Sequence, residues 1–196
     1  PKLYVMYSKD GQLSLVMSSH VDDLKGAATE EARQYMLKAL EDEFGKLKVS
    51  IGTFECIGIM HEQDPTTKEV WTHQHHYVKQ LHSINVEGQK FKDAEESVTP
   101  ELHSAYTSLL GGVAWLAQTM MPVCVYISYL QRCGKAPSYG DDRKLNRLLA
   151  WIKQNLEHLG LRYKKLNGPI RLAVVSDSAF KALEFEGLAV RGCILM

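Results

Sequence analysis

The spacing of apolar residues changes repeatedly along this chain, in the order sheet, helix, sheet, helices and sheet, and this order restricts the folds that the chain can adopt. Apolar residues alternate with polar ones over 3–7 and 13–21, recur at helical spacing through much of 104–160, and alternate again beyond residue 161. Alternation is typical of half-buried strands, whereas a repeat of three to four residues is typical of amphipathic helices. The order predicts an α+β fold with a helical middle and argues against a repeating strand–helix–strand unit.

Capping and turn residues give the expected boundaries. Thr29 is the candidate N-cap of one helix, and Gly45 is the residue at which it is expected to end. In a second helix, Asp141 or Asp142 is the candidate N-cap and Gly160 the expected end. In the first part of the chain we expect strands at 3–7 and 13–21, a strand after the Asp-Asp pair, a helix at 29–45, and a hairpin of strands 53–62 and 69–73 around the turn Asp64–Thr67. The middle is expected to contain a short helix at 74–83, an acidic loop at 87–101, and helices at 104–120, 122–132 and 140–160. The last part is expected to form a hairpin with an Asn-Gly turn within 161–180 and a strand at 188–196.

Charge is distributed unevenly in an otherwise ordinary globular composition. The 196 residues are enough for one large domain or two small ones. They include 23 basic and 23 acidic residues, so no overall basic charge indicates a nucleic-acid-binding protein. The segment 51–130 nevertheless has four Lys/Arg against nine Asp/Glu, and 131–171 has ten against three. A basic stretch therefore follows an acidic one.

The cysteines and the ends of the chain bear on its environment. The four cysteines form no C-x-x-C pair, so we expect free thiols in a reducing compartment. The sequence shows neither a signal peptide nor an apolar run long enough to span a bilayer. It opens with PKLYVMY and closes with GCILM, which are apolar where natural termini are usually polar. We expect this chain to be a piece of a longer polypeptide.

Two adjacent aspartates, Asp22 and Asp23, end the second expected strand in SSHVDDLKG. Such a pair is typical of a polar turn, in which Asp side chains accept hydrogen bonds from backbone donors. Paired carboxylates at a turn between strands are also ligands for divalent cations, whose charge offsets the repulsion between them. Two such ions, about 3.5–4 Å apart, activate the attacking oxygen and stabilise the leaving group in phosphoryl transfer. The residues by themselves leave both interpretations open.

The segment HVDDL resembles the Tyr/Phe-Val-Asp-Asp motif of reverse transcriptases, and the rest of the chain resembles blocks of copia-type LTR retrotransposon polyproteins in the same order. The resemblance covers nearly the whole chain. The primer-grip block is similar to FECIGIMHEQD, and the Gln-x-x-Tyr block is similar to EVWTHQHHYVKQLHSI. The Gly-Gly block and the helix after it are similar to YTSLLGGVAWLAQTMMPVCVYISYLQR, and the Leu-Arg-Tyr-Leu-Lys helix is similar to LNRLLAWIKQNLEHLGLRYKK. The opening of the RNase H domain is similar to VVSDSAF.

This resemblance implies a fold, a reaction and partners. It implies a late palm with the Asp-Asp and primer-grip hairpins at 1–73, a helical thumb/connection at 74–165, and the truncated start of an RNase H-like domain at 166–196. The implied reaction is RNA-directed DNA polymerisation with two Mg²⁺ (or Mn²⁺) ions. The implied partners are an RNA/DNA template–primer duplex, dNTP and the remainder of the pol polyprotein. The implied location is a cytoplasmic retrotransposon particle or the nucleus, without secretion or membrane attachment.

The resemblance also assigns roles to individual residues. Asp22 would be the catalytic metal ligand with Asp23 beside it, and Asp177 matches the first RNase H carboxylate. His20 departs from the family, which has Tyr or Phe there, and Phe180 stands where the family has Trp. The primer-grip residues, expected in one strand, would be Phe54, Ile57, Gly58 and Ile59.

Polymerisation also needs a metal-binding Asp from an earlier palm strand and fingers that grip the nucleotide, and both would lie upstream of this chain. We therefore expect the chain alone to extend no primer and to cut no hybrid. The alternative interpretation is a decayed or co-opted retroelement remnant that at most binds nucleic acid without catalysis.

Three further groups of residues have two interpretations each. The basic residues Arg143, Lys144, Arg147, Lys153, Lys164 and Lys165 form either a solvated surface or a phosphate track for the duplex. The histidines His73, His75, His76 and His82 form either a polar helix start or, at poorer ligand spacing, a zinc site. Trp115 and Trp151 lie on apolar helical faces and are expected in the core, whereas Trp71 could be in the core or stack on a ligand.

Overall fold

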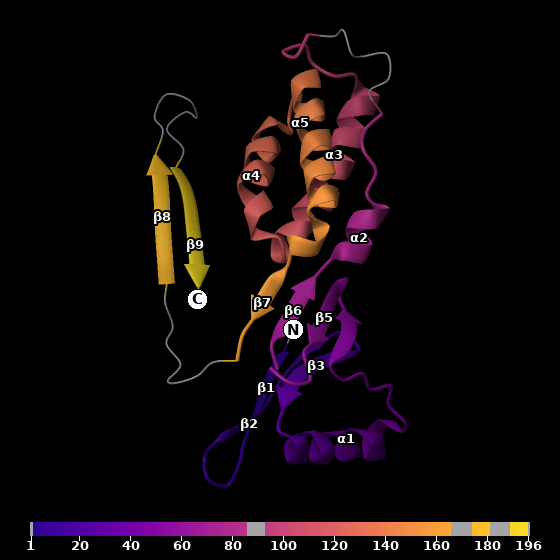
Figure 1. The fold of residues 1–196 in the computed structure, drawn as a ribbon, viewed down its shortest axis with the longest axis vertical. Helices are drawn as coiled ribbons and strands as arrows, with labels where there is room; N and C mark the ends of the chain where they lie inside the picture. Colours follow the sequence, from indigo (N-terminus) through magenta and orange to yellow (C-terminus); the bar gives the residue numbers. More distant parts are fainter. Residues whose placement is uncertain (1, 86–92, 166–173, 181–188, 196) are drawn as a thin grey trace. The chain divides into compact units, whose positions relative to one another are not determined.

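The structure is a computed structural model that describes residues 2–85, 93–165, 174–180 and 189–195, the last two segments as backbone. It divides into two compact units, Pro1–Tyr163 and Lys164–Met196. The first unit contains two antiparallel sheets and a group of helices, and the second contains a two-stranded hairpin (Figure 1). The α+β class predicted from the sequence is therefore confirmed.

A three-stranded antiparallel sheet opens the first unit. Its strands are β1 (Lys2–Tyr7), β2 (Leu13–His20) and β3 (Asp23–Ala28), in that order. Gly11 adopts a φ of +74° in the turn between β1 and β2, which is a conformation that glycine adopts without strain. The predicted strand–Asp-Asp–strand hairpin is confirmed.

Helix α1 (Glu30–Phe44) follows β3 directly. The Thr29 hydroxyl accepts a hydrogen bond from the Ala32 amide, and Gly45 follows the helix with a φ of +80°, so both predicted ends are confirmed. Of the helix's apolar side chains only Ala32 is buried, and Phe44 is 73% exposed. This part of the molecule therefore has little core of its own.

The second sheet consists of β4 (Thr53–Cys56), β5 (Ile59–Gln63), β6 (Val70–His73) and β7 (Leu161–Tyr163). The single strand predicted over 53–62 is wrong, because the chain reverses at Ile57 and Gly58. Phe54, Ile57, Gly58 and Ile59, expected in one strand, instead occupy a β-hairpin and its turn. The predicted turn at Asp64–Thr67 is confirmed, since the Asp64 carboxylate accepts hydrogen bonds from the amides of Thr66 and Thr67.

The helical part packs three long helices side by side (Figure 1). They are α3 (Pro100–Trp115), α4 (Cys124–Cys133) and α5 (Tyr139–Gln154), with the short α2 (His75–Gln80) against α3 and α5. Short 3₁₀ turns η1 (Leu116–Gln118), η2 (Met121–Val123) and η3 (Leu156–His158) complete it. The core lies here, and its fully buried side chains include Val78, Tyr106, Val113, Leu116, Leu145 and Ile152.

Several predicted helix boundaries are wrong, and α3, expected to run to residue 120, ends at Trp115. Helix α3 begins at Pro100 with Thr99 as its N-cap, earlier than expected, because proline suits the first helical position. Helix α5 has Ser138 as its N-cap rather than either aspartate, and Asp141 completes a capping box with it. The same helix ends at Gln154 rather than near Gly160.

The predicted hairpin within 161–180 is also wrong. Strand β7 pairs with β6, and β8 (Val174–Phe180) pairs with β9 (Ala189–Leu195). The Asn-Gly dipeptide expected to turn it lies outside the described residues. Alternation of apolar residues identified the strands correctly, but it does not say which strands pair.

Both tryptophans expected in the core are partly exposed, Trp115 by 39% and Trp151 by 42%. On α5 the neighbouring Ile152 is fully buried instead. Among the described residues, the model contains no helix that is both long and apolar enough to cross a membrane. Cys56, Cys124 and Cys133 are free thiols, as predicted.

Adjacent glycines in α3 provide a test of how α2 packs. A Cβ atom at Gly112 would lie 2.8 Å from Cδ2 of Leu81 and 3.2 Å from the Tyr77 hydroxyl oxygen, whereas at Gly111 it would meet nothing within 4 Å. Both substitutions by alanine gain helix propensity, about 0.5–1 kcal/mol. We expect Gly111→Ala to raise the free energy of unfolding by that amount and Gly112→Ala to lower it by about 1 kcal/mol. Urea denaturation measures both, and equal effects would contradict this packing.

Asp142 predicts a stability that depends on pH. Its side chain is fully buried, neither carboxylate oxygen is hydrogen-bonded to a described residue, and burial, with Asp141 nearby, raises its pKa to about 6. The folded protein therefore binds this proton more tightly than the unfolded chain. The stabilisation is complete below the ordinary pKa of 3.8 and is lost as the pH rises through about 6.

We expect Asp142→Asn to raise the free energy of unfolding by about 1–3 kcal/mol above pH 7 and to flatten its dependence on pH between 4 and 7. The matched variant is Asp141→Asn, because the Asp141 carboxylate accepts hydrogen bonds from Ser138 and Lys144. This variant should lower stability at neutral pH by about 1 kcal/mol. Urea denaturation at pH 4.5 and 7.5 distinguishes the two; destabilisation by Asp142→Asn at pH 7.5 would contradict the prediction.

Candidate functional site

The turn between β2 and β3 places the two aspartates. The strands pair from Leu15 opposite Ala28 to His20 opposite Asp23, so only Val21 and Asp22 remain to reverse the chain. Asp22 therefore lies at the apex of the hairpin and Asp23 at its first paired position, and both are exposed. We call β2, this turn and β3 the carboxylate hairpin.

The backbone of this turn is strained at Val21. Its φ is +55°, and its side chain is 91% exposed. A two-residue turn with a positive φ at its first position favours glycine there, because a Cβ atom clashes with the backbone in this region. A β-branched residue in this conformation costs about 1–3 kcal/mol. No packing of the side chain offsets that cost.

The two carboxylates have the chemistry of a metal site but not enough ligands. Neither is hydrogen-bonded or ion-paired to another described residue, and carboxylate oxygens are the ligands that Mg²⁺ prefers. However, no group of three or more His, Cys, Asp or Glu residues able to hold a metal occurs among the described residues. Asp22 and Asp23 could therefore contribute to a metal site only with ligands from elsewhere, and we derive no chemical step through a metal on this chain.

A second strained turn contains the residues that the sequence analysis assigned to the primer grip. Cys56 pairs with Ile59, and the two residues between them, Ile57 and Gly58, have φ values of +51° and +69°. Both φ values are positive, as in a type I′ turn. A positive φ is favourable for Gly58 but unfavourable for the β-branched Ile57. The Ile57 side chain is 43% exposed. Both turns that the sequence singled out thus hold a β-branched residue in an unfavourable conformation.

One side-chain contact that sequence reasoning missed joins the two sheets. Nζ of Lys25, in β3, lies 3.3 Å from Nε2 of His61, in β5. The His61 ring stacks on Phe54, with centroids 4.9 Å apart and planes 3° apart. Lys25 lies two residues from Asp23 and therefore on the same face of β3. That spacing is visible in the sequence, but nothing local indicates His61 as the partner.

The histidines His73 and His75, two of the candidate zinc-binding residues, contact other protein groups. The rings of His73 and His75 stack with centroids 3.9 Å apart, while His73 Nε2 lies 3.3 Å from a Glu62 carboxylate oxygen. His75 Nε2 donates a hydrogen bond to the Leu159 carbonyl at 2.8 Å, and burial lowers the pKa of His75. His75 is also the first residue of α2. These contacts support the interpretation as a structural helix start.

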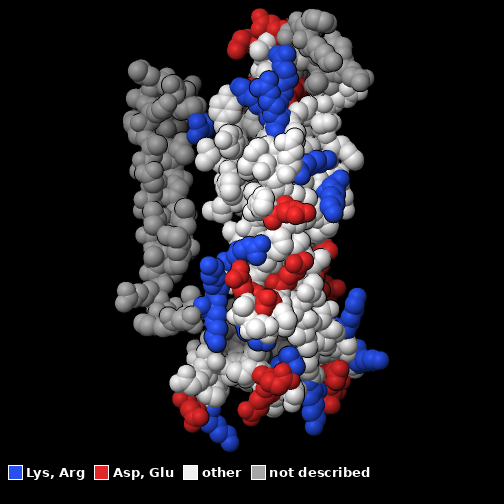
Figure 2. All heavy atoms as spheres, in the orientation of Figure 1, with Lys and Arg blue, Asp and Glu red and all other residues white. Residues whose placement is uncertain are grey.

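The predicted basic residues face different neighbours. Lys144 donates to the Tyr129 hydroxyl and to the Asp141 carboxylate, whereas Lys153 donates to the Leu81 carbonyl near α2. Arg147 is exposed on α5, and Arg143 has an interaction partner of its own. On the described part of the face in Figure 2, basic and acidic side chains are interspersed. Lys164 and Lys165 belong to the second compact unit.

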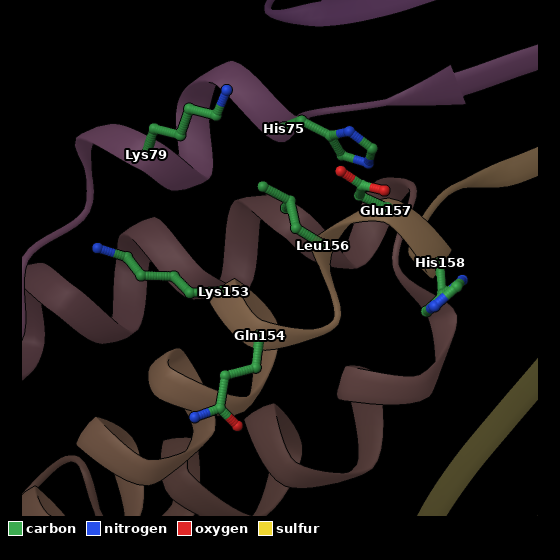
Figure 3. A pocket seen from close by; sticks show the side chains of 7 residues that line it. All are labelled: His75, Lys79, Lys153, Gln154, Leu156, Glu157 and His158. Carbon is green, nitrogen blue, oxygen red and sulfur yellow. The ribbon is translucent and has the colours of Figure 1, made fainter.

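A hollow of about 340 Å³ lies where the end of α5 and η3 meet α2. Figure 3 shows the ring of His75 and the carboxylate of Glu157 directed towards one another, while Lys79, Lys153 and Gln154 extend in other directions. The polar groups therefore do not converge on one point, as a catalytic constellation would require. The hollow is lined by His75, Lys79, Lys153, Gln154, Leu156, Glu157 and His158.

Asp177, the candidate RNase H carboxylate, lies in β8 opposite Gly192 in β9. Its side chain is outside the described part of the structure. No protein-family model, curated protein or solved structure matches the chain.

The strain at Val21 can be measured directly. Glycine adopts a positive φ without a steric penalty, so we expect Val21→Gly to raise the free energy of unfolding by about 1 kcal/mol. Val21→Ala, which keeps a Cβ atom, should gain clearly less. Urea denaturation of both variants provides the measurement, and a destabilised Val21→Gly protein would show that the turn is not strained.

Proposed function

We propose that this chain is a segment of a copia-type reverse transcriptase, an RNA-directed DNA polymerase. Asp22, with Asp23 beside it, would contribute ligands to a two-metal site. The turn Ile57–Gly58 would approach the primer end, and Gly58 would allow its backbone to come close. The partners would be a template–primer duplex, dNTP and the remainder of the polyprotein.

The carboxylate hairpin carries this proposal. A polar turn whose aspartates serve only the local backbone would use their oxygens to accept hydrogen bonds, as Asp64 does in the turn before β6. Asp22, at the apex of a strained turn, and Asp23, at the first paired position beside it, make no such bond to a described residue, and both are exposed. Strained backbone concentrates at functional sites, where the strain presents a side chain that a relaxed turn would not. This supports a role in binding a ligand.

The second turn adds support of the same kind. Ile57 and Gly58 both have a positive φ at the apex of β4 and β5, and the Lys25–His61 contact ties this hairpin to the carboxylate hairpin. A reaction that needs metal ligands and a primer-positioning turn requires the two on neighbouring, fixed elements. The contact between Lys25 and His61, which links the two hairpins, supports the proposal in this respect.

A non-enzymatic function is the alternative, and one observation favours it. The described residues offer a pair of carboxylates but no group of three or more potential metal ligands. A retroelement remnant that only binds nucleic acid would need exposed basic residues such as Arg147 and Lys164, but not the aspartates. The two functions therefore differ in what Asp22 does.

Primer extension tests the proposal. The protein, expressed with its native upstream coding region, should extend an RNA-templated DNA primer with Mg²⁺, and Asp22→Asn should lower the rate at least a hundredfold because a metal ligand loses its charge. The matched control is Asp10→Asn, which removes an exposed aspartate from the turn between β1 and β2. The 196-residue chain alone should show no extension.

Duplex binding distinguishes the remaining outcomes. Affinity that falls steeply with salt, without any extension, would overturn the polymerase proposal in favour of the nucleic-acid-binding remnant. Extension that survives Asp22→Asn would overturn the role of the aspartate pair.

A further inference from the structure

The Lys25–His61 contact is distinctive because of what it connects. The strand β3 belongs to the first sheet and β5 to the second, and no strand pairs across the two. Among the described residues of the two sheets, it is the one hydrogen bond that crosses between them, and no ion pair does so. The relative position of the two hairpins therefore depends on this contact more than on any other polar group.

The hydrogen-bond partners of His61 determine its tautomer. Nδ1 of His61 lies 3.0 Å from the Ile59 carbonyl oxygen, which can only accept, so the proton must be on Nδ1. Nε2 then carries a lone pair that faces the Lys25 ammonium, which can only donate. Each group thus has one role, and a protonated ring would break the pair because Nε2 would become a donor. Burial, and then the nearby charge of Lys25, lower the pKa of His61 and favour the neutral ring.

The ring is fixed on its other sides as well. Phe54, on β4, stacks on one face of the His61 ring, and the bond from Nδ1 to Ile59 fixes its rotation. Ile59 directly follows the strained turn, and Phe54 lies on the strand that precedes it. His61 therefore contacts both strands that flank the Ile57–Gly58 turn. On the other side of the contact, Lys25 is two residues from Asp23.

We propose that Lys25 and His61 are positioning residues, and that their hydrogen bond holds the carboxylate hairpin at a fixed place against β5, in the hairpin of β4 and β5 that turns at Ile57–Gly58. This inference rests on the proposed function for its catalytic consequence, but not for the contact itself. Lys25 donates, His61 accepts as the Nδ1–H tautomer, and neither residue touches the reacting atoms. The consequence is a fixed separation between the metal ligands and the primer-positioning turn.

Nuclear magnetic resonance of the 196-residue chain tests the contact without any activity. We expect the ¹⁵N signals of the His61 ring at pH 7.5 to show a protonated Nδ1 and a bare Nε2. Lys25→Met should shift the amide signals of Ile57 and Gly58, because the ring loses its anchor, and Lys25→Arg should restore them. Lys9→Met is the matched control, since it removes an exposed lysine from the turn between β1 and β2.

Substitutions of the acceptor complete the test. His61→Gln keeps an oxygen within reach of Lys25, whereas His61→Leu removes every acceptor. We expect the Ile57 and Gly58 amide signals to stay near their original positions in the first variant and to move in the second. An Nε2–H tautomer, or equal shifts in Lys25→Met and Lys9→Met, would overturn the positioning role.

Primer extension by the protein with its upstream region adds the catalytic measurement. We expect Lys25→Met to lower kcat about tenfold with little change in the KM for dNTP, because misplaced ligands slow the reaction more than they weaken binding. Lys25→Arg should restore most of the rate, and an unchanged kcat in Lys25→Met would contradict the catalytic consequence. If the unsubstituted protein shows no extension, the proposed polymerase function fails, and the nuclear magnetic resonance measurements still decide whether the contact positions the hairpins.

Discussion

The candidate site depends on the register between β2 and β3. Because His20 pairs with Asp23, the chain must reverse within Val21 and Asp22, and the first of these must adopt a positive φ. The same register decides which side chains share a face of β3, since a slip of one residue would move every side chain to the opposite face. Lys25 would then face away from His61. The exposed aspartates, the strained valine and the contact between the sheets are thus consequences of one pairing.

Stability and candidate function lie in different parts of the first unit. The buried apolar side chains cluster in α2 to α5, where Tyr106 donates its hydroxyl to the Leu130 carbonyl and Thr119 bonds to the buried Gln74. In the first sheet and α1, by contrast, only Leu15 and Ala32 are buried. The two strained turns, each costing about 1–3 kcal/mol, are therefore carried by elements that have little core to offset them. In β4 and β5, which flank the second turn, no side chain is fully buried either.

The sequence predicted elements better than it predicted how they meet. Apolar periodicity located nearly every strand and helix, because period and burial are local properties. It missed the reversal at Ile57–Gly58, since a β-branched residue at positive φ contradicts the preference on which turn prediction relies. It missed the pairing of β7 with β6 because these strands are almost ninety residues apart. The aspartate pair was predictable from its place after a strand, whereas the Lys25–His61 contact depends on how two separate sheets meet.

The face of the first sheet that carries Lys25 continues across β1 as apolar surface. Leu3 pairs with Ser18 and Val5 with Val16, so their side chains share this face, yet Leu3 is 69% and Val5 52% exposed. Tyr4, on the opposite face of β1, is also exposed, by 44%, so apolar side chains of this edge strand are exposed on both faces. In the proposed polymerase, more of the palm would cover this strand. A remnant that only binds nucleic acid through basic residues gives the strain at Val21 no role, whereas the metal site of the proposed polymerase does.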